Sequence, residues 1–320
     1  MSVIDVKSLG VQYFMKRGNI RAVDEVTLSV RKGETLGVVG ESGSGKSTLG
    51  LALIRLVPYP GSIVGGRILL DGTDLTSLPD KEMRQIRGRR IGFIFQDPMT
   101  SLSPVKKIGD HFIELIRAHE KGVDKAEALD RASKTLETLG ILRERVNDYP
   151  HQFSGGMRQR VMIGLALTLN PEFVIADEPT TSLDVIVEAQ ILELLKRLKE
   201  ALNITLMLIT HNIGIIAQTA DRVAVMYAGR LAELGPSLSL FADPLHPYTQ
   251  ALLSAVPNVS KPGRVLSWIP GSPPDLAFPP PGCLYNPRCR HAFDRCRREA
   301  PQLIDVGEGR SVACFLHYKG

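Results

Sequence analysis

Short runs of apolar residues alternate along the chain with longer stretches in which apolar positions recur every three to four residues. The short runs predict buried β-strands, and the three-to-four spacing predicts amphipathic helices. We therefore predict strands at residues 34–39, 67–70, 91–96, 173–176 and 205–210. Helices are expected at residues 46–56, 104–142, 154–169 and 186–202. Because strands and helices alternate, the pattern predicts an α/β fold with a mainly parallel sheet and a helical insertion.

The composition supports a globular chain and excludes two other classes. Of the 320 residues, 43% are hydrophobic and the mean hydropathy is +0.01, so a core is expected and general disorder is not. The longest apolar stretches, such as residues 161–169, reach about half of the roughly 20 residues that a membrane-spanning helix needs. The N-terminus lacks a charged-then-apolar signal pattern, so we expect the chain to stay where it is made. The net charge of +5 is spread too evenly to indicate a nucleic-acid partner.

A glycine-rich segment follows the first predicted strand and precedes the first predicted helix. Residues 40–47 read GESGSGKS and fit the pattern G-x-x-x-x-G-K-[ST] of phosphate-binding loops. In that pattern backbone N–H groups and the helix N-terminus bind phosphate, Lys46 reaches the β- and γ-phosphates, and Ser47 offers a hydroxyl to Mg²⁺. The predicted nucleotide-binding residues of this segment are Gly40, Ser42, Gly43, Ser44, Gly45, Lys46, Ser47 and Thr48.

Two acidic residues, Asp177 and Glu178, follow the predicted strand at residues 173–176. The carboxyl ends of parallel strands form the edge at which α/β sheets bind their ligands. Asp177 is expected to act on Mg²⁺ through the water shell of the ion, and Glu178 is expected to polarise an attacking water. Together with the phosphate loop, this pair predicts an enzyme that binds and hydrolyses ATP with Mg²⁺ as its cofactor.

A second glycine-rich helix start lies at Ser154, Gly155 and Gly156, within the sequence FSGGMRQR. A helix N-terminus with small residues is suited to an anion. At this motif the chain closely resembles the ATPases of ABC transporters, whose signature is LSGGQ; Phe153 replaces the usual Leu, and Met157 the usual Gln. The resemblance implies that the motif faces the phosphate loop of a second subunit, so that ATP lies between two chains. It also implies an N-terminal antiparallel part in the ATPase core.

The same resemblance assigns three further residues to the site. Gln96 is similar to the Q-loop glutamine, which contacts Mg²⁺ and the attacking water, and Asp184 ends a D-loop at residues 182–184. His211 is similar to the switch histidine that contacts the γ-phosphate. The family usually continues with Asp after this histidine, whereas this chain has Asn212. The resemblance therefore implies that Glu178, His211 and Gln96 are the catalytic residues.

The residue that stacks on adenine is not determined by these motifs. Tyr13, near the N-terminus, is the candidate, and Phe14 and Arg21 are competitors. An ordinary role in the core is the alternative for Tyr13.

The C-terminal part of the chain narrows the resemblance. The segment FADPLHPYTQALL at residues 241–253 and the string GCLYNPRC at residues 282–289 are similar to the region after the ATPase core in oligopeptide, dipeptide and nickel importers. The chain most resembles the ATP-binding subunits of bacterial dipeptide and oligopeptide importers. This class implies a second ATP-binding subunit, expected to be a paralogue, two membrane permease subunits and an extracytoplasmic solute-binding protein. It also implies a peripheral location at the cytoplasmic face of the inner membrane.

The expected function is to energise the uptake of di- or oligopeptides. Nickel and glutathione stay open as solutes, and a soluble ABC ATPase without a transport role is the less favoured alternative. We expect a nucleotide-binding core at residues 1–96 and 154–232 and a helical subdomain at 97–153, with permease contacts at 104–142. A linker at 233–260 and a cysteine-containing extension at 261–320 complete the expected domains.

The last 64 residues hold ten of the 21 prolines and all four cysteines of the chain. Because so many prolines oppose helices and strands, this tail is predicted to be irregular and to need a staple. The spacing C-x₅-C-x₆-C-x₁₇-C lacks the close pairs of zinc sites and favours a 4Fe–4S cluster, which the importer resemblance also implies. Zinc, with His291 or His317 as a further ligand, and unligated thiols are the alternatives. The predicted cluster ligands are Cys283, Cys289, Cys296 and Cys314.

Several arginines lie among these cysteines. They admit three interpretations: a solvated face, a contact with another subunit, or a contact with nucleic acid. The arginines are Arg288, Arg290, Arg295, Arg297 and Arg298.

Overall fold

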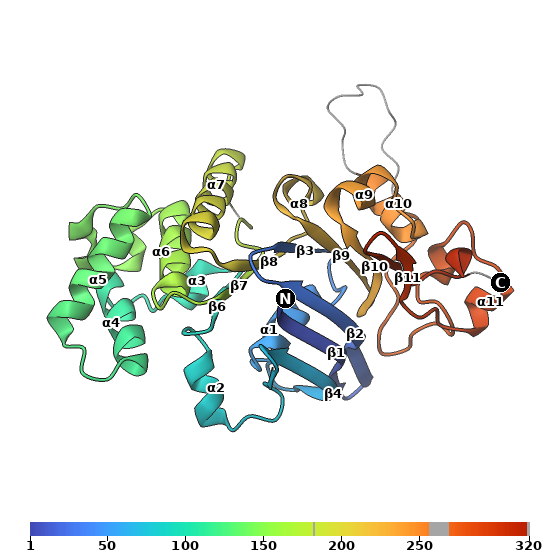
Figure 1. Cartoon of the computed structure of the whole chain (residues 1–320), viewed down its shortest axis with the longest axis horizontal. Coiled ribbons are helices and arrows are strands. Elements are labelled where there is room, and N and C mark those ends of the chain that lie inside the picture. Colours follow the sequence, from blue (N-terminus) through green and yellow to red (C-terminus); the bar gives the residue numbers. More distant parts are fainter. Residues whose placement is uncertain (182, 256–268, 319–320) are drawn as a thin grey trace. The chain divides into compact units, whose positions relative to one another are not determined.

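The computed structural model describes residues 1–181, 183–255 and 269–318 (Figure 1). The chain divides into two compact units. The first unit comprises Met1–Ser77 and Leu208–Gly320, and the second comprises Leu78–Met207. Along the sequence, the second unit is therefore an insertion into the first. One residue of the predicted D-loop, at position 182, and the end of the predicted linker with the start of the extension lie outside the described residues.

An antiparallel sheet opens the first unit. β1 (Ser2–Met15) lies between β2 (Gly18–Arg31) and β4 (Gly61–Leu70) (Figure 1). β5 (Thr73–Asp74) pairs with β4 at one edge of the sheet. Shifts in register, typical of β-bulges, interrupt the pairing of β1 with β2 at several points. This sheet confirms the antiparallel N-terminal part, of which the apolar pattern alone predicted only residues 67–70.

Fully buried strands form the centre of the first unit. β3 (Thr35–Val39) and β9 (Arg222–Tyr227) are parallel neighbours in which every residue is buried. β10 (Arg230–Pro236) turns back and pairs antiparallel with β9. The helix α1 (Lys46–Leu53) follows β3, and α8 (Ile213–Thr219) packs against β3. The strand and the helix expected on either side of the glycine-rich segment are confirmed, whereas β9 and β10 were not predicted.

The C-terminal extension is more regular than its proline content predicts. β12 (Arg310–Val312) pairs antiparallel with β10, and β11 (Ile304–Gly307) pairs antiparallel with β12. The expectation of an irregular tail is therefore wrong for these residues, because a segment without proline uses the edge of β10 to satisfy its backbone hydrogen bonds. The other elements described after β10 are α9 (Ser237–Ala242), α10 (Pro247–Ser254), η3 (Asn286–Arg288), α11 (Asp294–Arg298) and η4 (Phe315–His317).

The second unit combines two parallel strands, β6 (Ile91–Ile94) and β7 (Phe173–Asp177), with a helical region. Phe112, Leu136 and Val161, each from a different helix, belong to one buried apolar cluster. The expected helical insertion is thus present. Its helices are α2 (Asp80–Ile86), α3 (Pro98–Ser101), α4 (Ile108–His119), α5 (Lys125–Thr138), η1 (Arg143–Asn147), η2 (Pro150–Gln152), α6 (Gly155–Leu167) and α7 (Val185–Leu202).

Local signals explain where these elements differ from the prediction. The helix expected at residues 104–142 is broken between α4 and α5, where Gly122 has φ 93° and the Asp124 carboxylate accepts a 2.8 Å hydrogen bond from the N–H of Glu127. β8 (Thr205–Ile209) contains the boundary between the two units. Among the described residues, no helix has the length and apolar character needed to cross a membrane.

Candidate functional site

The glycine-rich segment forms the loop between β3 and α1, as its motif predicts. Gly45 immediately precedes α1 and has φ 97°, a backbone conformation that favours glycine. A Cβ atom on Gly45 would lie 2.1 Å from the carbonyl oxygen of Ala22 in β2, so a side chain cannot be accommodated there. The loop therefore packs its backbone directly against β2, and the glycine is required by both conformation and space.

Lys46 is buried, with 5% of its surface exposed, and its charge is held inside the loop. Its Nζ donates to the carbonyl oxygens of Gly40 at 2.9 Å and Glu41 at 3.0 Å. The hydroxyl of Ser44 is also buried and has no hydrogen-bond partner among the residues that the structure describes. A buried cation beside an unsatisfied hydroxyl, at the start of a helix, fits an anionic phosphate ligand. Ser42 and Gly43 are exposed, and Ser47 and Thr48 are half-buried in the first turn of α1.

The predicted acid pair lies at the end of β7 in the second unit. Asp177 is buried as the last residue of the strand, and Glu178 follows with φ 45°, which is unusual for a residue with a side chain. The amide nitrogen of Gln96 donates to Oε2 of Glu178 at 2.9 Å, and the hydroxyl of Thr181 donates to the same oxygen at 2.9 Å. The predicted strand included Gln96. Because β6 ends at Ile94, Gln96 instead lies in the loop after the strand. The loop conformation nevertheless brings Gln96 and Glu178 into contact.

Two helix N-termini contact each other in the second unit. Ser154 caps α6 by accepting a 3.3 Å hydrogen bond from the N–H of Met157, and Asp184 caps α7 by accepting from two N–H groups at 2.9 and 3.1 Å. A Cβ atom on Gly156 would lie 2.6 Å from Cγ1 of Val187, so glycine is needed for the close approach of the two helices. The first turns of α6 and α7, which follow Ser154 and Asp184, are therefore closely packed.

His211 and Tyr13, the remaining predicted residues, lie in the first unit. His211 is exposed beyond the end of β8, and Asn212 caps α8 by accepting from the N–H of Gly214 at 3.1 Å. Asp and Asn are equivalent as helix caps, so the departure from the family pattern preserves this local structure. Tyr13 is half-buried in β1, while the neighbouring Phe14 is 50% exposed.

The structure contradicts the predicted 4Fe–4S cluster. The four cysteines are free thiols that line a cavity of about 20 Å³, which is room for roughly one water molecule. Within the described residues, no group of three or more His, Cys, Asp or Glu side chains could hold a metal ion. Burial raises the pKa of Cys283 and of Cys314 to about 11, which favours the protonated thiol over the thiolate that binds metals. The iron–sulfur prediction is wrong, and the zinc alternative finds no support.

Contacts of the phosphate loop with the C-terminal region were not predicted. The N–H of Glu41 donates to the hydroxyl of Tyr248 at 2.8 Å, and the Glu41 carboxylate forms two hydrogen bonds with Arg288 at 2.7 and 2.9 Å. Tyr248 lies in the HPYT sequence that suggested an importer, but nothing in that motif indicates its partner. Because only 5% of its side chain is exposed, Arg288 is not part of a solvated face, which was one of the three interpretations of the C-terminal arginines.

The loop, the acid pair and the capped glycine helix define a phosphate-loop ATPase, and comparisons with known proteins agree. Residues 23–181 match the model of the ABC transporter family, and residues 232–296 match that of the oligopeptide/dipeptide transporter C-terminal region. The chain is 46% identical over 318 residues to the oligopeptide transport ATP-binding protein OppD of Bacillus subtilis, covering 98% of this chain and 88% of that protein. It is 44% identical over 320 residues to the dipeptide transport ATP-binding protein DppD of Escherichia coli, covering 99% and 97%.

A solved structure supports the same assignment. The dimeric structure of MJ0796, a bacterial ABC transporter cassette, matches with a TM-score of 0.65 and 30% sequence identity, over 73% of this chain and 98% of that one. The fold is accordingly that of an ABC ATPase cassette, an ATP-hydrolysing enzyme. The chain belongs to the family of ABC transporter ATP-binding subunits that carry the oligopeptide/dipeptide transporter C-terminal region. Membership of this family implies membrane permease partners.

Proposed function

We propose that this chain binds and hydrolyses ATP to drive the import of di- and oligopeptides. The observation that carries the proposal is the extent of the similarity: about 45% identity to peptide transport subunits covers the ATPase cassette and also the C-terminal region. The C-terminal region matters because cassettes of many functions share the ATPase core, and a shared fold does not by itself imply a shared function.

In the proposed mechanism the first unit binds the phosphates of ATP. Lys46 would exchange the loop carbonyls that it now contacts for β- and γ-phosphate oxygens, and the Ser44 hydroxyl would gain a partner. Bound Mg²⁺ neutralises charge on these phosphates. Ser47 and Gln96 are the residues proposed to hold the ion, with Asp177 acting through water. For Gln96, the amide nitrogen contacts Glu178, which leaves the amide oxygen as the ligand atom.

Hydrolysis needs a water molecule oriented toward the γ-phosphate. Glu178 is proposed to accept the proton of this water, and the two donors on its Oε2 hold the carboxylate in one orientation. His211 is proposed to contact the γ-phosphate, and Tyr13 to stack on adenine. Positioning of this kind supplies most of the catalysis in phosphoryl transfer.

The proposed assembly pairs two ATP-binding subunits. Ser154, Gly155 and Gly156 of one subunit would meet the phosphate loop of the other, and Asp184 would lie at the same contact. We propose a paralogue as the second subunit, two permease subunits that contact α4 and α5, and an extracytoplasmic solute-binding protein. The chain would then act as a peripheral protein at the cytoplasmic face of the inner membrane, with its core at residues 1–96 and 154–232.

Reconstitution with the membrane partners tests this proposal. The complete transporter in proteoliposomes is expected to take up labelled di- or oligopeptides when ATP is supplied, and Lys46→Ala is expected to abolish uptake. ATP hydrolysis should be stimulated by the permease subunits and not by nucleic acid. Uptake of nickel or glutathione in place of peptides would replace the proposed solute, and stimulation by nucleic acid alone would contradict a transport role.

A further inference from the structure

Arg288 extends from the C-terminal extension to the phosphate loop, 247 positions earlier in the sequence. Its two terminal nitrogens donate to the two carboxylate oxygens of Glu41 at 2.7 and 2.9 Å. Only 5% of the Arg288 side chain and 24% of the Glu41 side chain are exposed. Hydrogen bonding to Glu41 holds the pKa of Arg288 above its ordinary value. A two-pronged and largely buried pair of this kind is among the stronger ionic contacts in proteins.

Every polar group of Glu41 is engaged. Its N–H donates to the Tyr248 hydroxyl at 2.8 Å, and its carbonyl oxygen accepts from Nζ of Lys46 at 3.0 Å and from the N–H of Ser44 at 3.2 Å. The carboxylate is bound by Arg288. The same residue thus connects the C-terminal region to the lysine that is proposed to bind phosphate.

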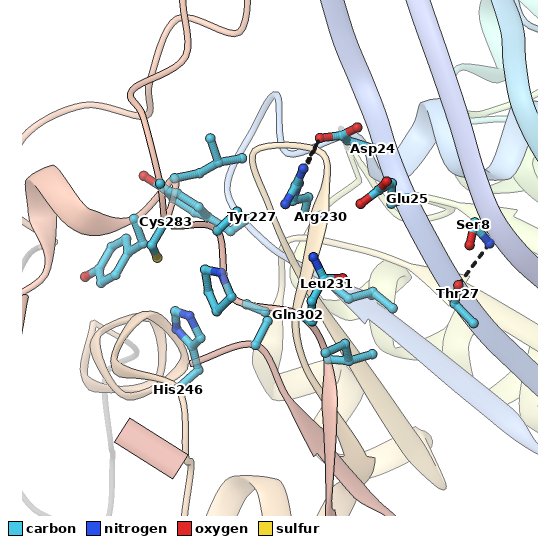
Figure 2. A pocket seen from close by; sticks show the side chains of 18 residues that line it. Ser8, Asp24, Glu25, Thr27, Tyr227, Arg230, Leu231, His246, Cys283 and Gln302 are labelled. Atoms are coloured by element: carbon cyan, nitrogen blue, oxygen red, sulfur yellow. Dashed lines mark hydrogen bonds and ion pairs between the residues drawn. The ribbon is translucent and has the colours of Figure 1, made fainter. Parts of the chain in front are cut away.

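Aromatic rings and a backbone oxygen hold Arg288 in place. Its guanidinium lies 5.8 Å from the ring centre of Tyr227 and 6.0 Å from that of Tyr285, and its Nε donates to the carbonyl oxygen of Pro270 at 2.8 Å. Tyr227 and Tyr285 also line a pocket of about 370 Å³. Figure 2 shows this pocket, with Tyr227 labelled and the Arg230 side chain pointing to Asp24. Arg288 is therefore a buried side chain with several partners and not an exposed surface arginine.

An acidic residue is an unexpected neighbour for a bound triphosphate. Lys46 and the N–H groups of the loop attract anions, whereas an unpaired carboxylate at Glu41 would repel them. When Glu41 is paired with Arg288, the repulsion between its carboxylate and the phosphates is reduced. The positive charge of the loop is then available to the phosphates.

We propose that Arg288 is a positioning residue for ATP binding, which neutralises Glu41 and fixes the phosphate loop from the C-terminal extension. The inference rests on the proposed use of this loop to bind ATP. It gives the extension a function in the nucleotide site of its own chain, in addition to any role in the transporter.

The test measures binding of Mg²⁺–ATP to the purified full-length chain by calorimetry. Arg288→Met removes the charge but keeps an apolar stem, and is expected to raise the Kd about tenfold because the Glu41 carboxylate is left unpaired. Adding Glu41→Gln to Arg288→Met removes the repelling charge and is expected to return the Kd to within about threefold of the wild-type value. A loss of ATP affinity caused only by disturbed packing around Arg288 would not be reversed by Glu41→Gln.

Two further variants complete the test. Arg295→Met is the matched control, since Arg295 pairs with Glu299 in the same extension, is 48% exposed and should leave the Kd unchanged. Arg288→Lys keeps the positive charge but cannot form the two-pronged contact, so its Kd is expected to lie between those of the wild type and a folded Arg288→Met.

The proposal is overturned if Arg288→Met binds ATP like the wild type, if Glu41→Gln fails to rescue it, or if Arg288→Lys binds as weakly as a folded Arg288→Met. Failure of the nucleotide site itself gives a different result. In that case the wild-type chain would not bind Mg²⁺–ATP, or Lys46→Ala would bind it equally well.

Discussion

The amide of Gln96 and the hydroxyl of Thr181 both donate to Oε2 of Glu178, each at 2.9 Å. Because both donors bind the same oxygen, together they hold the carboxylate in one orientation. The positive φ of Glu178 directs its side chain from a backbone conformation that few residues other than glycine adopt. A strained backbone with two side-chain donors is consistent with a base that must be held in one position.

Glu178→Gln is expected to stop turnover while leaving nucleotide binding intact. The substitution removes the acceptor for the proton of the attacking water, and loss of such a group reduces rates by about 10²- to 10⁴-fold. Steady-state ATP hydrolysis of the assembled transporter measures the effect, and retained ATP is measured after filtration. Glu193→Gln, at an exposed position of α7, is the matched control and should hydrolyse ATP normally. Near-normal hydrolysis by Glu178→Gln would show that another group activates the water.

Gly45→Ala is expected to destabilise the phosphate loop far more than Gly43→Ala. Both glycines have positive φ, but a Cβ on Gly45 would lie 2.1 Å from the Ala22 carbonyl oxygen, whereas a Cβ on Gly43 would meet no atom of the described residues within 4 Å. Gly45→Ala combines backbone strain with a steric clash and should lower the free energy of unfolding by about 2–4 kcal/mol. Gly43→Ala should lower it by about 1 kcal/mol. Thermal unfolding of the two variants measures the difference. Equal losses would indicate that the contact with β2 is not rigid.

Gly156→Ala is expected to destabilise the contact between α6 and α7. The new Cβ would lie 2.6 Å from Cγ1 of Val187, a stiff β-branched side chain, and such overpacking costs about 1–3 kcal/mol. Val187→Ala in the same chain should recover most of this loss, since it removes the colliding methyl group. Gly155→Ala is the control for stability, because its nearest neighbour would be Leu183 at an ordinary 3.5 Å. The interpretation fails if the double variant unfolds at the same temperature as Gly156→Ala.

The sequence predicted the parts of this protein whose signals are local. β3 and β7 are unbroken apolar runs, and the residues after them carry motifs at fixed spacing, so both the strands and the candidate site residues could be located. The strands β1 and β2 were not predicted, because shifts in register interrupt the two-residue alternation that identifies a half-buried strand. The strand β9 could have been predicted from its apolar run, since all six of its residues are buried and five of them are apolar.

Contacts between distant segments have no comparable local signal in the sequence. Glu41 and Arg288 are 247 positions apart, and neither residue belongs to a pattern that indicates its partner. The cysteines illustrate the opposite error: their spacing suggested a cluster, but spacing reports neither the space between the sulfur atoms nor the burial that raises the pKa of Cys283 and Cys314. Both features depend on tertiary packing and became visible only in the folded chain.

His246 is expected to make the stability of the first unit depend on pH. The side chain is 3% exposed, its Nδ1 accepts from the N–H of Tyr248 at 2.9 Å, and burial lowers its pKa from 6.5 to about 4. Above pH 6.5 the imidazole is neutral in both the folded and the unfolded chain, so its contribution to stability is fully present. Between pH 6.5 and 4 the unfolded chain takes up a proton that the folded chain does not, and stability falls by about 3 kcal/mol.

The measurement compares thermal unfolding of the wild type and of His246→Asn across this pH range. Asn keeps an acceptor for the N–H of Tyr248 but does not titrate, so the variant should be less stable above pH 6.5 and should lose less stability on acidification. The two unfolding curves should therefore converge as the pH approaches 4. His291→Asn, at an exposed position, is the control and should follow the wild type. Parallel curves for the wild type and His246→Asn would mean that acid destabilises the chain through other groups, because the proton taken up by an unfolded His246 would then have no measurable effect.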